Sequence, residues 1–176
     1  MGISDILNII NKLDKLEFLY NRTIGADFTT FNLKINNTAI RLIIFDTRGL
    51  EGYKTFITSF CRNVSLGIFV YAINSRYSFE RINLWVKELK KVKINLKKFL
   101  IGTKANLEEE REVSYEEGQK YKEDNNFDMF MEISRFNDEE INNIFIEAGK
   151  LLYERYESNK SNFYQKFNKL NRYYNL

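Results

Sequence analysis

The segment Phe45-Asp46-Thr47-Arg48-Gly49-Leu50-Glu51-Gly52 decides the fold class of this 176-residue chain. It directly follows an apolar run, residues 39–44, that is typical of a strand. Nucleotide-binding α/β proteins place an acidic residue at the end of such a strand, beside Mg²⁺, and a glycine-bearing turn after it, beside the γ-phosphate. The segment therefore predicts a nucleotide-binding α/β fold.

Composition is that of one globular domain with few catalytic options. The chain is 44% apolar, and at this length it can bury about 70% of its unfolded surface. A net charge of +3, with Lys and Glu interleaved, gives no support for a nucleic-acid partner. Because there is no His and only one Cys, Ser-His and Cys-His catalysis, the common zinc sites and an internal disulfide are excluded.

The sequence predicts neither a membrane span nor a lipid anchor. No apolar run reaches the roughly 20 residues that cross a bilayer. Residues 172–176 contain no Cys that could be prenylated, and residue 6 is not the Ser or Thr that favours myristoylation. We therefore expect a cytoplasmic protein that reaches endomembranes, as a peripheral protein, only through its partners.

Strands alternate with helices along most of the chain. The predicted strands are 28–35, 39–45, 66–73, 98–102 and 127–133, and the predicted helices are 5–19, 78–92, 114–125 and 138–156. Asn36-Asn37 is a predicted hairpin turn, and Ser114 with Glu117 a predicted capping box. This order predicts a three-layer α/β fold with helices on both faces of a mostly parallel central sheet. Residues 1–157 form the predicted domain and 158–176 a helical or flexible extension.

Several segments resemble the Ras-like small GTPases, and within them the Rab family. The segments are residues 23–28, 41–51, 61–71, 78–85, 102–107 and 132–135. They follow the family's order and approximate spacing, so the resemblance depends on the whole set and not on one motif. It implies the small-GTPase fold, GTP or GDP with Mg²⁺ as cofactors, and protein effectors or complex subunits as partners.

The resemblance assigns roles on the phosphate side of a nucleotide site. Thr23 is similar to the switch I threonine, whose hydroxyl and backbone meet Mg²⁺ and the γ-phosphate. Asp46 would hold the Mg²⁺ shell, and Gly49 would donate its N–H to the γ-phosphate. The implied metal residues are therefore Thr23 and Asp46. The alternative is that these residues persist only as structural parts of an inherited fold.

The resemblance also assigns a base side and a surface for effectors. Lys104 would pack its aliphatic stem on the guanine ring, and Ser134 would approach the base. The implied nucleotide-base residues are Thr103, Lys104, Asn106, Ser134 and Arg135. The implied effector-contact residues are Ile24, Phe28, Phe45, Phe56 and Trp85. Core packing is the alternative for the aromatic residues, and it suits Trp85 better than the others.

Three departures from the family pattern weaken the predicted activity, and the first is the P-loop. That loop needs G-x-x-x-x-G-K-[ST] after a strand. Counted back from Thr23, its end falls at Gly2-Ile3-Ser4, where Ile3 replaces the Lys. Losing three charge-assisted phosphate contacts of ~2 kcal/mol each lowers affinity by roughly four orders of magnitude. GTP or GDP with Mg²⁺ is therefore expected to bind weakly or not at all.

The other two departures affect hydrolysis and base choice. Leu50 stands where the family has the Gln that orients the attacking water, so no catalytic residue is predicted and hydrolysis is expected to be very slow or absent. Asn106 replaces an Asp that accepts two guanine N–H groups. Its NH₂ would face a guanine donor, a mismatch of ~1–3 kcal/mol, and xanthine would fit better. Arg135 replaces a small residue of the last base loop.

The central strand that precedes the P-loop in the family is also missing from the sequence. Its absence would leave a gap between the strand ending at Asp46 and the strand at 66–73. Either these two strands pair directly, or a partner supplies the strand, or the sequence is an incomplete form of a longer product. The third explanation is favoured because evolution rarely removes a central strand cleanly.

The sequence supports three functional hypotheses. The first is a Rab-like protein of intracellular vesicle and membrane traffic that binds effectors, with GTP binding weakened or lost and hydrolysis negligible. The second is a pseudo-GTPase that serves as a fixed subunit of a larger assembly. The third is a GTP-binding Rab GTPase whose P-loop lies outside this sequence, although Leu50 and Asn106 would still need an explanation.

Overall fold

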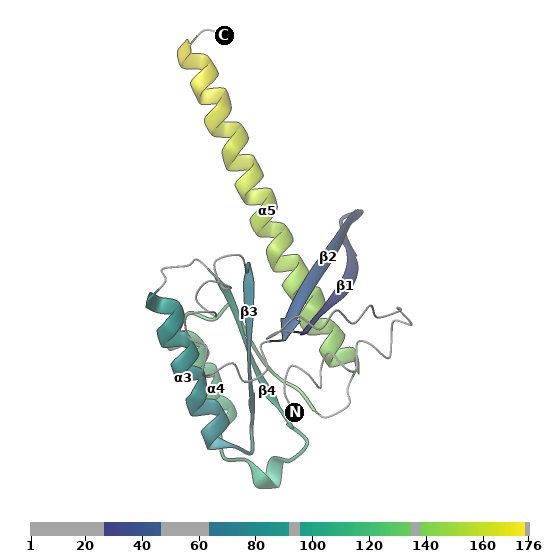
Figure 1. The fold of residues 1–176 in the computed structure, drawn as a ribbon, viewed down its shortest axis with the longest axis vertical. Helices are drawn as coiled ribbons and strands as arrows, with labels where there is room; N and C mark the ends of the chain where they lie inside the picture. The colour runs from purple at the N-terminus through teal and green to yellow at the C-terminus, as the bar shows by residue number, and fades with distance from the viewer. Residues whose placement is uncertain (1–26, 47–63, 92–95, 135–137, 175–176) are drawn as a thin grey trace.

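The computed structural model describes residues 27–46, 64–91, 96–134 and 138–174, without the side chains of residues 27, 28, 46, 138 and 161–174. The helix predicted over 5–19 lies outside these residues. Figure 1 shows the observed elements, which are β1 (Asp27–Ile35), β2 (Thr38–Asp46), β3 (Leu66–Ala72), α3 (Arg76–Lys91), β4 (Lys97–Thr103), the 3₁₀-helix η2 (Glu108–Glu110), α4 (Tyr115–Asp124), β5 (Met129–Glu132) and α5 (Asp138–Tyr174). Their order confirms the predicted alternation of strands and helices.

Strands β3, β4 and β5 form a parallel sheet that is covered on both faces. β4 is central, and its consecutive side chains point to opposite faces. Leu100 is buried on the side of α3 and α4, whereas Phe99 and Ile101 are buried on the side of α5. Apolar residues at successive positions are typical of a strand that is buried on both faces of a parallel sheet. The predicted parallel sheet between helix layers is therefore confirmed for these strands (Figure 1).

Strands β1 and β2 form a separate antiparallel hairpin. Asn36 and Asn37 have φ angles of 47° and 67°, the left-handed conformation that a two-residue type I′ turn requires. Along β2, Leu42 packs on the core, whereas its neighbour Ile43 is 58% exposed and Phe45 is 39% exposed. The hairpin therefore has one packed face and one exposed face.

The two sheets are not joined within the described part of the chain, because β2 and β3 share no hydrogen-bonded ladder there. Direct pairing of these strands, one of the three arrangements considered above, is therefore wrong. Both sheets instead pack against α5. The Phe145 ring lies 5.3 Å from the Phe31 ring of β1, and Phe145 also belongs to the cluster that contains Phe99 and Ile101 of β4. A shared hydrophobic layer thus positions the two sheets without a continuous ladder.

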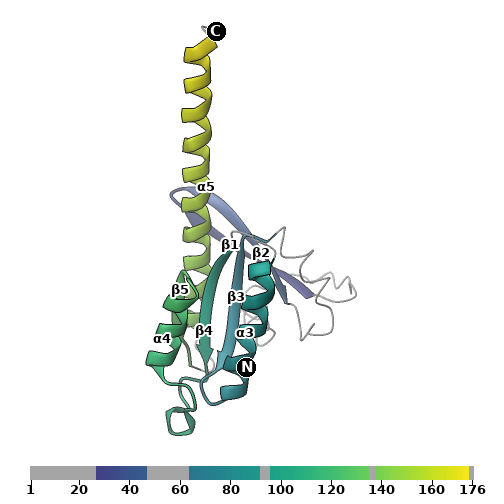
Figure 2. The ribbon, with the colours of Figure 1, turned by 90° about the vertical axis from the view of Figure 1, so that its left-hand side faces the viewer.

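Helix α5 is 37 residues long and leaves the sheets before it ends. Ile141, Phe145 and Ala148 are buried, whereas Tyr156 is 59% exposed. Figure 2 shows the later part of the helix projecting beyond both sheets. Within the described residues, no helix combines the length and apolar character needed to span a membrane. The domain boundary at residue 157 stays a prediction.

Candidate functional site

The predicted base-side residues gather at the carboxyl ends of β4 and β5. β4 ends at Thr103, and Ser134 follows two residues after the end of β5. Because the two strands are parallel neighbours, both ends lie at the same edge of the sheet. The Ala105 N–H donates to the carbonyl oxygen of Ile133 at 3.0 Å and joins the two loops. The structure therefore brings Ser134 to the loop that contains Lys104.

Thr103 is directed into the sheet. Its side chain is fully buried, and its hydroxyl donates to the Tyr71 carbonyl oxygen at 2.8 Å. Its own carbonyl oxygen accepts the Ile73 N–H at 3.0 Å. A hydroxyl that satisfies a buried carbonyl stabilises the pairing of β3 with β4. This contact gives Thr103 a structural role that its position in the motif did not reveal.

Lys104 and Asn106 form the turn that follows. Lys104 has a φ of 64°, a left-handed conformation that costs a non-glycine residue roughly 1 kcal/mol and is common at functional sites. The Leu107 N–H closes the turn by donating to the Lys104 carbonyl oxygen at 2.8 Å. Lys104 is half-buried, and Asn106 is exposed. The turn therefore holds the Asn106 amide at the surface of this edge.

The Ser134 loop is held by a residue that the sequence reasoning missed. The Ser134 N–H donates to Oε2 of Glu140 at 2.9 Å. Glu140 lies in the first turn of α5, where a carboxylate is favoured by the helix dipole. No sequence signal linked these residues, although an acidic residue in a first helical turn can reach back to preceding backbone amides. Arg135, the other predicted residue of this loop, lies outside the described residues.

Arg111 forms a second connection that the sequence did not indicate. Its guanidinium donates to both carboxylate oxygens of Glu132 on β5, at 2.9 and 2.7 Å, and to both oxygens of Glu108 on η2. Hydrogen bonding to Glu132 and then to Glu108 raises the pKa of Arg111. The hydrogen bond from Arg111 lowers the pKa of the Glu108 carboxyl. The segment after Asn106 is thereby fixed to β5 by paired charges.

The phosphate-side residues belong to a different part of the molecule. Asp46 is the last residue of β2 and pairs in register with Asp27, the first residue of β1. Its backbone therefore lies at one end of the hairpin, as the strand prediction placed it. Thr23, Gly49 and Leu50 lie outside the described residues. Their predicted roles stay predictions, as does the role of the Asp46 side chain.

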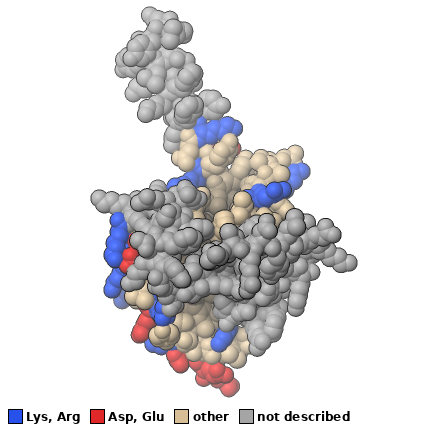
Figure 3. Space-filling view, viewed as in Figure 1, with Lys and Arg blue, Asp and Glu red and all other residues tan. Residues whose placement is uncertain are grey.

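The described effector residues are divided between the hairpin and helix α3. Phe45 is on the exposed face of the hairpin, and its backbone pairs with that of Phe28 in the antiparallel register. Trp85 is half-buried on α3. Ile43, which the sequence analysis did not select, is more exposed than Phe45. Figure 3 shows tan surface with Lys and Arg on the hairpin, and acidic side chains at the opposite end of the molecule. Ile24 and Phe56 lie outside the described residues.

The fold and the position of these loops define a class of protein. A parallel sheet lies between helix layers, and its functional loops follow the carboxyl ends of its strands. In α/β proteins of this kind, ligands bind at that edge of the sheet. The chain is therefore an α/β protein whose candidate loops lie at the edge of the sheet where such proteins bind ligands.

Comparisons with known proteins identify the family. A model of the Ras family matches residues 8–154. The Ras-related protein RHN1 of Nicotiana plumbaginifolia is 40% identical over 138 residues, which cover 78% of this chain and 68% of that protein. The Ras-related protein Rab5 of Nicotiana tabacum is 38% identical over the same lengths. Rab-5A of Dictyostelium discoideum is 38% identical over 131 residues, or 74% of this chain and 65% of that protein. The chain belongs to the Ras family of small GTPases and is Rab-related.

Members of this family generally bind GTP or GDP with Mg²⁺, and Rab proteins bind protein effectors. The described base-side residues do not fit guanine well. The Thr103 hydroxyl is bonded to Tyr71 inside the sheet, and Asn106 offers an amide where a carboxylate would accept two N–H groups. Among the described side chains at this edge, Asn106 thus offers one amide oxygen where an Asp would offer two carboxylate oxygens to guanine.

Proposed function

We propose that this protein acts in intracellular vesicle traffic by binding protein effectors through the exposed face of the β1–β2 hairpin. The main support is the exposure of Ile43 and Phe45, two apolar side chains on the same face of β2. Exposed apolar neighbours of this kind mark protein contact surfaces. Burying them against a partner would contribute about 25 cal/mol for each Å² of apolar surface removed from water.

The proposal includes weakened or lost nucleotide binding and negligible hydrolysis. Leu50 has no donor or acceptor with which to orient a water molecule. The Asn106 amide places a donor opposite a guanine donor, and the Thr103 hydroxyl is used within the sheet. These three residues support a protein that has the fold and effector surface of a Rab protein but binds guanine nucleotides weakly and hydrolyses GTP negligibly.

A nucleotide titration tests this part of the proposal. The full chain is titrated with fluorescent GDP, GTP and xanthosine diphosphate in the presence of Mg²⁺. We expect guanine nucleotides to bind more weakly than micromolar and the xanthosine nucleotide to bind more tightly than GDP. The matched variant Asn106→Asp should reverse that order, because one mispaired edge is worth ~1–3 kcal/mol, or roughly 5- to 150-fold. Micromolar or tighter GDP binding by the unmodified chain would contradict the proposal.

A fixed subunit of a larger assembly is the second candidate function. The length and projection of α5 favour it, because a helix that extends beyond both sheets offers additional surface for a permanent contact. The same titration distinguishes the two, provided that partner binding is measured alongside. An effector-binding protein that still switches would bind its partner differently with and without nucleotide. A fixed subunit would bind its partner equally in both conditions.

A further inference from the structure

Among the described residues, β3 is an outer strand of the parallel sheet, although its sequence is typical of a central one. β3 is hydrogen-bonded to β4 on one side, and no described strand pairs with its other side. Its residues, Leu66–Ala72, include no charged residue and no Pro. Natural proteins commonly protect an edge strand from further pairing with charges, Pro or a covering element. The open edge of β3 is therefore suited to pairing with another strand.

The hydrogen bonds at the two ends of β3 show which backbone groups face this open edge. The Ile73 N–H donates to the Thr103 carbonyl oxygen, and the Ser65 carbonyl oxygen accepts the Lys97 N–H. Because the backbone groups of alternate residues in a parallel strand point to the same neighbour, the odd-numbered residues of β3 face β4. The even-numbered residues present both their N–H and their C=O to the open edge.

Serine residues before and within α3 close one end of this edge. The Ala72 N–H donates to Oγ of Ser78 at 3.0 Å, and the Ala72 carbonyl oxygen accepts the Ser75 N–H at 3.0 Å. For the other even-numbered residues, no hydrogen bond within the described part of the chain satisfies the groups on this side. These residues are Leu66, Ile68 and Val70. At 3.3 Å per residue they span ~16 Å of strand edge with alternating donors and acceptors.

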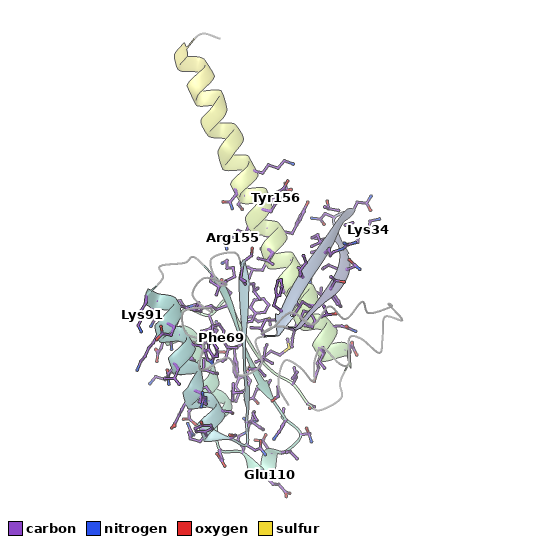
Figure 4. The ribbon with its side chains drawn as sticks, in the orientation of Figure 1. Lys34, Phe69, Lys91, Glu110, Arg155 and Tyr156 are labelled. Atoms are coloured by element: carbon purple, nitrogen blue, oxygen red, sulfur yellow. The ribbon has the colours of Figure 1, made fainter. Side chains whose placement is uncertain are left out.

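The side chains next to the open edge are apolar on both faces of the sheet. On the α5 face, Ile68 packs against the cluster that contains Phe99 but is only half-buried, whereas Phe99 itself is buried. On the other face, Phe69, which Figure 4 labels on β3, packs against the cluster that includes Phe79 of α3 and is also half-buried. A further strand would cover both side chains if its own residues were apolar on both faces, as those of β4 are.

The hairpin favours a single strand over a second copy of the chain. Leu42 and Ile44 of β2 pack against the same α5 cluster as Ile68. A second copy would bring its whole parallel sheet to this edge, together with its own hairpin. One extended segment needs only the ~4.8 Å that separates neighbouring strands.

We infer that β3 accepts one extended segment of a partner protein, which pairs with the backbone of Leu66, Ile68 and Val70 and places apolar side chains on both faces of the sheet. Backbone hydrogen bonds would supply affinity, and the two apolar clusters would select the side chains. This is the arrangement considered above in which a partner supplies a strand. It does not depend on the proposed effector surface or on nucleotide.

Hydrogen exchange of the full chain, followed for each amide by NMR, provides the test. The probe is a capped peptide with the sequence of β4, residues 97–103, because that sequence is apolar on both faces. With the peptide at ten times its Kd, the amides of Ile68 and Val70 should exchange about tenfold more slowly. The amides of Gly67 and Phe69 already face β4 and should be unchanged.

The matched control is the same peptide with N-methyl groups on its three central amides. Methylation removes donors from both edges of the peptide and keeps its side chains. The methylated peptide should therefore bind about thirtyfold more weakly, or ~2 kcal/mol for two lost hydrogen bonds. Equal binding of the two peptides would overturn the inference, as would unchanged exchange of Ile68 and Val70 at saturating peptide.

Exchange in the chain alone tests the other two occupants of the edge. Slow exchange of Ile68 and Val70 at every protein concentration would mean that the chain itself pairs with this edge. Slow exchange that appears only at high concentration would indicate a second copy. Either result would overturn the inference of a partner strand.

A pair of proline variants tests the assignment of the edge within the chain. Val70→Pro should keep the domain folded, because Pro is tolerated where a strand N–H faces away from its neighbour, and should bind the peptide about tenfold more weakly. Phe69→Pro removes a donor that faces β4 and should shift thermal unfolding to a lower temperature. A folded Val70→Pro variant that binds the peptide as tightly as the unmodified chain would contradict pairing at this edge.

Discussion

The two sheets of this protein share one helix but differ in how they bury their residues. β4 lies between α5 on one face and α3 with α4 on the other, so both faces of the strand are covered. β2 packs only its inward residues, such as Leu42, and leaves Ile43 and Phe45 exposed. Within the described residues, α5 packs on both sheets, whereas α3 and α4 pack in the cluster of the parallel sheet. Among the described residues, Ile43 and Phe45 therefore give the hairpin the exposed apolar face on which the proposed effector contact would form.

The largest expected effect comes from removing the side chain that both sheets share. Phe145→Ala should lower the free energy of unfolding by about 3–5 kcal/mol, as large-to-small changes in a core do. Phe145 is 3% exposed and contacts the Phe31 ring. Urea denaturation measures the loss. In this variant the hairpin amides should also exchange faster, relative to those of β4, than in the unmodified chain. The reason is that the described packing of the hairpin is chiefly on α5.

Phe79→Ala is the matched control for this prediction. Phe79 is a Phe of similar burial, but it packs in the other cluster, between α3 and the parallel sheet. The Phe79→Ala variant should lower the free energy of unfolding without changing the hydrogen-exchange rates of hairpin amides relative to those of β4. If both variants changed the hairpin and β4 equally, the two sheets would be a single cooperative unit and the comparison would fail.

Local patterns allowed the elements of both sheets to be predicted, but not the relation between the sheets. Asn36-Asn37 gave the hairpin because its turn chemistry is local, and the Ser114–Glu117 capping box was confirmed with both of its hydrogen bonds. Whether β2 and β3 pair is decided by hydrogen bonds between segments far apart in the sequence. The hydrophobic pattern of each strand does not contain that information.

Two glycines test how tightly each sheet is packed, because each lies where a helix approaches one of the sheets. A Cβ added at Gly118 on α4 would lie 2.5 Å from the Phe130 ring and 2.8 Å from the Tyr71 hydroxyl. A Cβ added at Gly149 on α5 would lie 2.5 Å from the Cδ1 methyl of Leu33. The first contact is with rings in the packed layer, whereas the second is with the end of a flexible side chain.

Gly118→Ala should therefore destabilise the protein by about 1 kcal/mol or more, since overpacking costs ~1–3 kcal/mol and exceeds the gain in helix propensity. Gly149→Ala should be roughly neutral, because Leu33 can change rotamer and Ala favours the helix. Thermal unfolding of the two variants measures the difference. A larger loss in Gly149→Ala would mean that the hairpin is packed as rigidly as the parallel sheet.

The candidate site shows a similar limit of sequence reasoning. The motif placed Lys104 and Asn106 at the end of a strand, and the structure gathers them with Ser134 at one edge. The partners that fix this edge were not predicted. Thr103 bonds to Tyr71, 32 residues away, and Arg111 bonds to Glu132, 21 residues away. Contacts at such separation depend on the packed fold, and neither residue type nor local spacing indicates them.

The smallest expected effect concerns an ion pair that belongs to the parallel sheet alone. The Arg76 guanidinium at the start of α3 donates to both carboxylate oxygens of Glu117 on α4, at 2.6 and 2.9 Å. On the hairpin, Arg41 instead donates to the uncharged Asn32 side chain. The hydrogen bond from Arg76, followed by the backbone N–H of Ser114, lowers the pKa of Glu117 to about 2. We therefore expect the stability of the helix layer over the parallel sheet to depend on pH through Glu117.

Because the folded pKa of Glu117 lies below its ordinary value of 4.5, its contribution is complete above that pH and is lost as the pH falls towards 2. Both side chains are 40% or more exposed, so the contribution should be under ~1 kcal/mol. Glu117→Gln keeps the capping box and removes the charge. Its unfolding free energy should fall below that of the unmodified chain at pH 6 and approach it near pH 3. Glu116→Gln, one residue away on α4, is the control and should differ little at either pH. A deficit that stayed constant with pH would assign the effect to cap geometry instead of charge.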